Sequence, residues 1–195
     1  FESRFRAISC SSAGNCTAVG ELRDKDVNRR ALVATSAGGA WGTGKAVTFD
    51  EGVEQISMFS NTFLLSVSCT ATGSCTAAGR VFTNRGEANE AFTVTSTAGV
   101  WAKGLVATYA EGTDNQFDDQ FNAVSCSSPG NCTAAGYFRT VGGTPPNKQG
   151  MTQTSTNGVW AVAVPATFDA ETHVDEFRAI SCTATGSCTA VGTGS

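Results

Sequence analysis

Short segments in which apolar and small polar residues alternate recur along the whole chain. Residues 5–10 read Phe-Arg-Ala-Ile-Ser-Cys, and residues 121–126 read Phe-Asn-Ala-Val-Ser-Cys. Side chains on a β-strand point alternately to its two faces, so this alternation is typical of strands with one face toward the core. No segment has apolar residues at the 3.6-residue spacing of an amphipathic helix. The pattern therefore predicts an all-β fold built from short strands.

Two motifs alternate along the chain at one period. The first, S-C-x-x-x-G-x-C-T-A-x-G, occurs four times, and its first cysteines are 59, 57 and 56 residues apart. The second, T-S-x-x-G-x-W, occurs three times between them, and together the motifs contain all eight cysteines and all three tryptophans. Such internal similarity identifies a repeat protein. We divide the single repeat domain 1–195 into repeats 1 to 4, at residues 5–62, 63–120, 121–176 and, as a half unit, 177–195.

Each complete repeat is predicted to contain four strands. The first strand ends at the first cysteine of the motif, a turn with glycine follows, and the second strand begins at the other cysteine. The third strand covers residues 31–35, 91–95 or 151–154, and the fourth begins at the tryptophan. Loops of variable length, rich in glycine, asparagine and charge, join the second strand to the third. About three and a half such units follow one another.

The eight cysteines form four C-x5-C pairs, each across a predicted tight turn. Facing residues of an antiparallel hairpin have Cα atoms about 4.5 to 5.5 Å apart, which a disulfide can span. Pairing between repeats would break the repeat symmetry, so we predict Cys10–Cys16, Cys69–Cys75, Cys126–Cys132 and Cys182–Cys188. The alternative, a zinc site, lacks the usual shorter cysteine spacing and nearby histidines. Structural disulfides imply an oxidising, extracellular compartment.

The tryptophans Trp41, Trp101 and Trp160 each follow a turn glycine by two residues. An indole at the start of the next strand can fold over the hairpin and pack between repeats. The alternative is a row of exposed aromatic platforms for sugar rings. The glycines favour packing, because they let the backbone approach closely at the turn.

Composition and charge narrow the classes of partner. Charged residues make up 15% of the chain, against about 25% in an average soluble domain. The net charge is −4 at pH 7, and the densest basic stretch, residues 23–30, is interrupted by Asp24 and Asp26, which argues against nucleic acid. No apolar run approaches the ~18 residues of a membrane span. No signal peptide is recognisable and the chain starts at Phe1, which suggests a processed chain or a fragment of a longer one.

Candidate chemistry is sparse. His173 is the single histidine, and no nucleophile elbow, phosphate loop or dinucleotide motif occurs. Acidic pairs stand before the first strand of repeats 2, 3 and 4, and the cluster Asp114, Asp118 and Asp119 is a weak candidate calcium site. The alternatives are a solvated loop that protects a sheet edge and a glycosidase-like carboxylate pair. We expect a protein without enzyme activity, cofactor or resident metal.

The two motifs resemble the repeats of about 57 residues, each with a cysteine hairpin, of long secreted bacterial proteins, notably of actinobacterial type. The resemblance covers nearly the whole chain and implies β-propeller-like blades and an exported protein, but little about activity. The tryptophan turn also resembles, loosely, the Asp-box of sialidase-type propellers. It departs from that motif because no aspartate stands at the turn and one residue is missing before each tryptophan. No catalytic residue carries over.

The number of units shapes the functional expectation. A closed propeller needs at least four blades in the usual range, so three and a half units predict an open array whose ends are capped or paired. Head-to-tail pairing that does not close grows filaments. We therefore expect a non-enzymatic structural or adhesive subunit of a surface fibre, a homo-oligomer or polymer. The alternatives are a fragment of a larger propeller and a lectin-like module that binds glycan through its tryptophans or through loops 24–29, 83–89 and 139–148.

Overall fold

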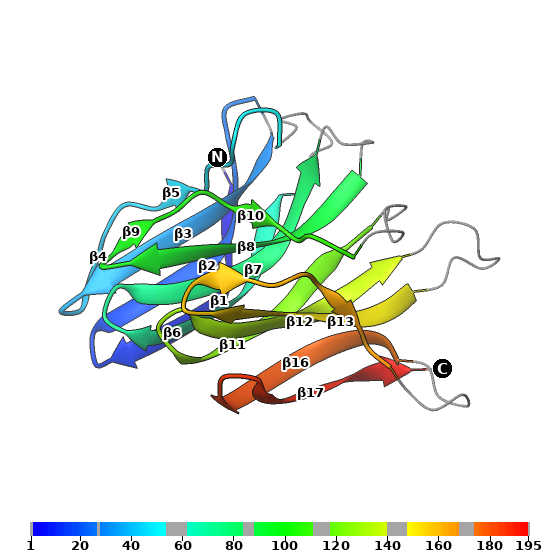
Figure 1. Ribbon diagram of the computed structural model, residues 1–195. Coiled ribbons are helices and arrows are strands. Elements are labelled where there is room, and N and C mark those ends of the chain that lie inside the picture. Colours follow the sequence, from blue (N-terminus) through cyan, green and yellow to red (C-terminus); the bar gives the residue numbers. More distant parts are fainter. Residues whose placement is uncertain are drawn as a thin grey trace.

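The computed structural model describes residues 2–26, 28–53, 62–83, 88–110, 118–139, 148–167 and 174–194. Within these ranges the chain forms antiparallel sheets and no helix, which confirms the predicted all-β fold. The sheets follow one another in chain order, from the blue N-terminal sheet to the orange and red C-terminal hairpin (Figure 1). Each sheet corresponds to one sequence repeat.

Repeats 1 to 3 share one sheet topology. The first strand pairs with the second, the second with the third, and the third with two short strands. Repeat 1 contains β1 (Ser3–Ser12), β2 (Asn15–Arg23), β3 (Arg29–Ala37), β4 (Ala40–Trp41) and β5 (Lys45–Ala46). Repeat 2 contains β6 (Phe63–Ala71), β7 (Ser74–Thr83), β8 (Ala88–Thr97), β9 (Val100–Trp101) and β10 (Leu105–Val106). Repeat 3 contains β11 (Gln120–Ser128), β12 (Asn131–Arg139), β13 (Lys148–Thr156), β14 (Val159–Trp160) and β15 (Val164–Pro165). The described part of repeat 4 is the hairpin of β16 (Val174–Ala184) and β17 (Ser187–Gly194).

The predicted fourth strand is broken into two pieces in each complete repeat. In repeat 2, β9 and β10 both pair with β8. Between them, Gly104 donates its N–H to the carbonyl of Thr48 in repeat 1, at 2.8 Å, and Ala163 of repeat 3 makes the same bond to Thr108 at 2.7 Å. In repeats 2 and 3, the interrupted strand therefore also bonds to the preceding repeat.

The four predicted disulfides are present, one across the turn between the first and second strands of every repeat. Their Cα atoms lie 3.9 to 4.0 Å apart, closer than the predicted separation, since the covalent bridge draws the strands together. The described residues contain no free cysteine. The zinc interpretation is therefore wrong, because no thiolate is left to bind a metal.

A β-bulge shapes the first strand of every repeat. In repeat 1 the pairing skips a residue between Phe5 and Ala7, which face Gly20 and Val19. A Cβ atom on Gly20 would lie 1.9 Å from the carbonyl oxygen of Arg4. The two strands approach too closely there for any side chain, so the last glycine of the cysteine motif is required by the bulge.

The bulge also shows which residues of the first strands correspond between repeats. Leu64 faces Gly79 just as Phe5 faces Gly20. Leu64 therefore occupies the place of Phe5 in the strand register, one residue after Phe63, where the sequence division begins repeat 2. The deciding feature is the distance to the cysteine turn, which is constant among the repeats.

The core lies between successive sheets. One buried cluster joins repeat 1 to repeat 2, and a second joins repeat 2 to repeat 3. The first cluster includes Val19, Ala31, Val33 and Val47 from repeat 1 with Leu64, Val67 and Phe92 from repeat 2. The second includes Ala78, Ala91 and Ala107 from repeat 2 with Phe121, Val124 and Met151 from repeat 3. Each repeat is thus stabilised chiefly by its neighbours, as in other repeat proteins.

Candidate functional site: the repeat faces

Each sheet has two faces that differ in their neighbours. We call the face that packs on the preceding repeat the back face, and the face that packs on the following repeat the front face. Back faces carry large side chains, such as Phe121 and Met151 of repeat 3, both fully buried. Front faces carry small ones, such as Ala78 and Ala91 of repeat 2. Large groups seated against small ones fill the junction closely.

A serine hydroxyl joins neighbouring repeats at every junction. In repeats 1 to 3, the serine before the first cysteine accepts a hydrogen bond through its Oγ. The donor is the backbone N–H of the first cysteine in the next repeat, and the N–Oγ distance is 3.0 Å each time. The three pairs are Ser9 with Cys69, Ser68 with Cys126, and Ser125 with Cys182. Repetition at one distance marks a regular junction.

A threonine hydroxyl makes a second regular contact, with the disulfide of the next repeat. Thr17 lies 3.3 Å from the Sγ of Cys75, Thr76 lies 3.3 Å from that of Cys132, and Thr133 lies 3.3 Å from that of Cys188. A disulfide sulfur carries no proton, so the hydroxyl is the donor. Sequence reasoning did not assign a role to these serines and threonines. The sequence feature that could have revealed them is the serine directly before the first cysteine and the threonine directly after the second, which occur in every repeat.

The back face of repeat 1 is exposed. Phe5, Ile8 and Trp41 have exposed fractions of 52%, 60% and 51%. The equivalents of Phe5, Leu64 and Phe121, have exposed fractions of 0%. A shallow groove of about 540 Å³ runs over this face, lined by Phe5, Arg6, Ala7, Ile8, Ala18 and Trp41. Exposed apolar surface of this kind marks an interaction site in soluble proteins.

The hairpin of repeat 4 presents the opposite half of a junction. Within the described residues no backbone N–H donates to the Ser181 hydroxyl, which corresponds to Ser9 in repeat 1. Val191, the equivalent of the buried Val19, is 60% exposed. At the other end of the array, no described serine accepts the N–H of Cys10. The two ends therefore carry the unmatched halves of the contact found at each internal junction.

The structure separates the three predicted tryptophans into two groups. Trp101 and Trp160 are partly buried against the clusters between sheets. Trp41 occupies the same position in repeat 1 but lies on the exposed back face. The three indoles do not form one exposed row.

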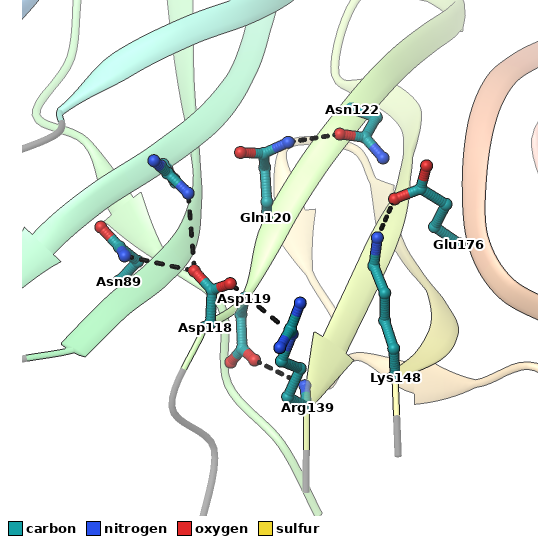
Figure 2. A network of polar contacts seen from close by, with 9 residues as sticks. Asn89, Asp118, Asp119, Gln120, Asn122, Arg139, Lys148 and Glu176 are labelled. Atoms are coloured by element: carbon teal, nitrogen blue, oxygen red, sulfur yellow. Dashed lines mark hydrogen bonds and ion pairs between the residues drawn. The ribbon is translucent and has the colours of Figure 1, made fainter. Parts of the chain in front are cut away.

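A polar network lies beside the junctions of repeats 2, 3 and 4, at the strand ends away from the disulfide turns (Figure 2). The Asp118 Oδ1 accepts hydrogen bonds from Arg80 Nη1 at 3.5 Å and Asn89 Nδ2 at 3.2 Å. Its Oδ2 lies 3.7 Å from Arg139 Nε. Two arginines from neighbouring repeats thus share one carboxylate, which links the two repeats at this junction.

Asp119 has different partners, although it is adjacent in the sequence. It is 1% exposed. Its Oδ2 accepts a hydrogen bond from the Tyr109 hydroxyl at 2.7 Å, and its Oδ1 accepts one from the backbone N–H of Arg139 at 3.3 Å. Burial raises the pKa of Asp119 to about 7, aided by the charges of Glu90 and Asp118 and opposed by the two hydrogen bonds. Burial also raises the pKa of Tyr109. The pair is enclosed, so it serves the junction and offers no accessible proton donor.

These partners bear on the predicted calcium site. The carboxylates of Asp118 and Asp119 are engaged by separate groups, and Asp114 lies outside the described residues. No group of three or more histidine, cysteine, aspartate or glutamate side chains suited to a metal occurs in the described ranges. The single histidine, His173, also lies outside them.

Of the two other predicted acidic pairs, residues 50–51 lie outside the strands, where Asp50 pairs with Lys103 at 2.7 Å. Residues 175–176 lie inside β16 rather than in a loop before it. Glu176 is buried and forms ion pairs with Lys148 of repeat 3 and with Arg178. It therefore belongs to the junction between repeats 3 and 4, which Figure 2 shows beside the Asp118 network.

No protein-family model matches the chain, and a search of curated proteins finds no relative of it. The part of the chain that the structure describes includes no helix of the length and hydropathy needed to cross a bilayer.

Proposed function

We propose that this chain is a non-enzymatic, extracellular structural subunit that assembles head to tail through its repeat faces. The back face of repeat 1 in one copy is covered by a front face of another copy. Successive sheets then continue across the contact as β-propeller-like blades of one array, and a rotation that does not close would give a fibre.

The exposed back face of repeat 1 carries this proposal. Phe5, Ile8 and Trp41 occupy the positions at which repeat 2 buries Leu64 and Val67 and partly buries Trp101. The internal junctions show the kind of surface that covers such residues. It is a front face of valines or alanines with a serine hydroxyl that accepts the cysteine N–H, and we propose that a second copy supplies it.

The remaining chemistry fits a structural role. The acidic groups Asp118, Asp119 and Glu176 are engaged in contacts at repeat junctions, which favours a scaffold over an acid–base catalyst. The four disulfides are consistent with an oxidising, extracellular environment. Each closes a short turn and stiffens the hairpin that forms the junction.

The test is the association state of the purified chain from micromolar to millimolar concentration, followed by light scattering and negative-stain electron microscopy. Ile8→Asp places a charge on the exposed back face and should weaken association roughly 100-fold or more. Val159→Asp is the matched control, since Val159 is equally apolar and 74% exposed but lies at a turn of repeat 3. It should assemble as the unmodified chain does.

Three outcomes would contradict the proposal. The unmodified chain could stay monomeric over the whole range, Ile8→Asp could assemble normally, or both variants could fail equally. Circular dichroism of each variant separates lost association from lost folding.

A further inference from the structure

We propose that the groove between repeats 2 and 3, at the disulfide-turn end of the sheets, binds a single neutral sugar ring. The groove has a volume of about 280 Å³. That is just below the range of about 300 to 1,000 Å³ typical of sites for drug-sized ligands, and it suits a small ligand. The site is independent of the exposed back face of repeat 1.

Hydroxyl groups and one amide supply the polar lining. Thr70, Ser74 and Thr97 of repeat 2 face Ser128 and Asn157 of repeat 3 across the groove. Within the described residues, the hydroxyls of Thr70, Ser74 and Thr97 have no hydrogen-bond partner in the protein. Because a hydroxyl can both donate and accept, these groups can pair with sugar hydroxyls in either sense.

The floor of the groove is rigid. The buried Ser96 hydroxyl accepts the Cys75 N–H at 3.1 Å and donates to the Gly73 carbonyl at 3.0 Å. Thr76, also buried, contacts the hydroxyl of Thr95 and the sulfur of Cys132. A preformed site loses little conformational entropy on binding.

The chemistry of the lining selects the ligand class. No charged side chain lines the groove, so it offers no partner to an anion or a cation. Pro129 and the disulfide sulfurs of Cys126 and Cys132 provide apolar surface beside the hydroxyls. A neutral sugar ring presents both kinds of surface, hydroxyls at its edge and C–H groups on its faces.

Two sequence differences set this corner apart. Repeats 1 and 3 carry Asn15 and Asn131 before the second cysteine, and each amide bonds the serine hydroxyl across its turn at 2.9 Å, Ser12 or Ser128. Repeat 2 has Ser74 in place of the asparagine and Ala71 in place of that serine. These shorter side chains make no such bond and occupy less space at the corner.

The experiment is ¹H–¹⁵N correlation NMR of the intact chain titrated with methyl glycosides of glucose, galactose and mannose, with N-acetylglucosamine, and with sialic acid as a charged comparison. We expect millimolar binding of at least one neutral sugar, with shifts concentrated at residues 70–76, 95–97 and 128–132. Sialic acid should bind more weakly.

Ser74→Asn should reduce the affinity roughly tenfold or more, because the larger amide side chain projects into the corner. Ser187→Asn is the matched control, since Ser187 holds the equivalent place in repeat 4, and the described residues include no further repeat beside it. It should bind as the unmodified chain does. Both variants carry a residue already tolerated at this position, and a thermal melt checks their folding.

The inference is overturned if no neutral sugar shifts the groove resonances at high millimolar concentration, if sialic acid binds best, or if Ser74→Asn and Ser187→Asn behave alike. Repeating the titration on Ile8→Asp separates this proposal from head-to-tail assembly. Sugar binding should persist in that variant whether or not the unmodified chain assembles.

Discussion

Strands β12 and β17 begin with almost the same sequence but lie in different surroundings. Both carry the second cysteine of a disulfide as their second residue. Both pair with the first strand of their repeat in the same bulged register, and both keep the glycine opposite the bulge. Residues 132–138 of β12 are all buried, whereas most of β17 is exposed. β12 pairs on both edges, but within the described residues β17 pairs only with β16. The local sequence thus specifies the hairpin, and neighbouring repeats supply its burial.

Phe121 and Phe5 occupy equivalent positions on a covered and an exposed back face. Truncating them should give the largest difference in the free energy of unfolding. Phe121→Ala should destabilise the chain by about 3–5 kcal/mol, because it empties a fully enclosed site. Phe5→Ala should cost less than about 1 kcal/mol in the dilute, unassembled chain, because half of that side chain is already in water. Urea unfolding followed by tryptophan fluorescence measures both. Equal costs in dilute solution would show that the two back faces are covered alike and would break the comparison.

Replacing Asp119 should give the next largest change in folding stability, and this change depends on pH. Its folded-state pKa of about 7 lies above the ordinary value of 3.8, so the folded chain holds this proton more tightly than the unfolded chain. The resulting stability is fully present below about pH 4 and is lost as pH rises through about 7. Asp119→Asn should therefore be more stable than the unmodified chain by about 4 kcal/mol at pH 8 and nearly equal to it near pH 4.

Urea unfolding of Asp119→Asn across this pH range is the measurement, with Asp26→Asn as the matched loss of one surface charge. A variant that is destabilised at pH 8 would mean that the bonds from Tyr109 and Arg139 outweigh burial. The carboxylate would then be the form that the junction requires.

The turn glycines give the smallest effect. Gly130 and Gly186 have the same backbone conformation, with φ of 76° and 75°. A Cβ atom on Gly130 would lie 2.8 Å from the Gly158 nitrogen, whose N–H donates to the Gly130 carbonyl, whereas one on Gly186 meets nothing within 4 Å. Alanine at either place pays the positive-φ cost of about 1–2 kcal/mol. Gly130→Ala should cost a further ~1–2 kcal/mol through the lost turn contact.

Thermal or urea unfolding of the two variants measures this difference. If Gly186→Ala proved the more damaging variant, some group outside the described residues would have to cover the turn of repeat 4.

Much of the fold could be predicted from the sequence because its determinants are local. Alternation of apolar and polar residues indicates strands, the paired cysteines indicate hairpins, and the two motifs indicate the repeat. The bond that Gly104 makes beside the broken fourth strand could not be predicted, because its carbonyl partner lies in another repeat. The role of Asp119 was missed for the same reason, since its partners Tyr109 and Arg139 come from different repeats.

The sequence by itself determined the units of this protein: the strands, the disulfides and the glycines that their bulges and turns require. These follow from covalent geometry and from steric limits over a few residues, which act wherever the sequence occurs. The tertiary structure alone decided which copies of each motif are buried, which acidic groups lose their solvent, and where faces stay open. Burial depends on what lies across a junction, and one motif meets different neighbours at Phe5 and Phe121, or at Ser74 and Ser187.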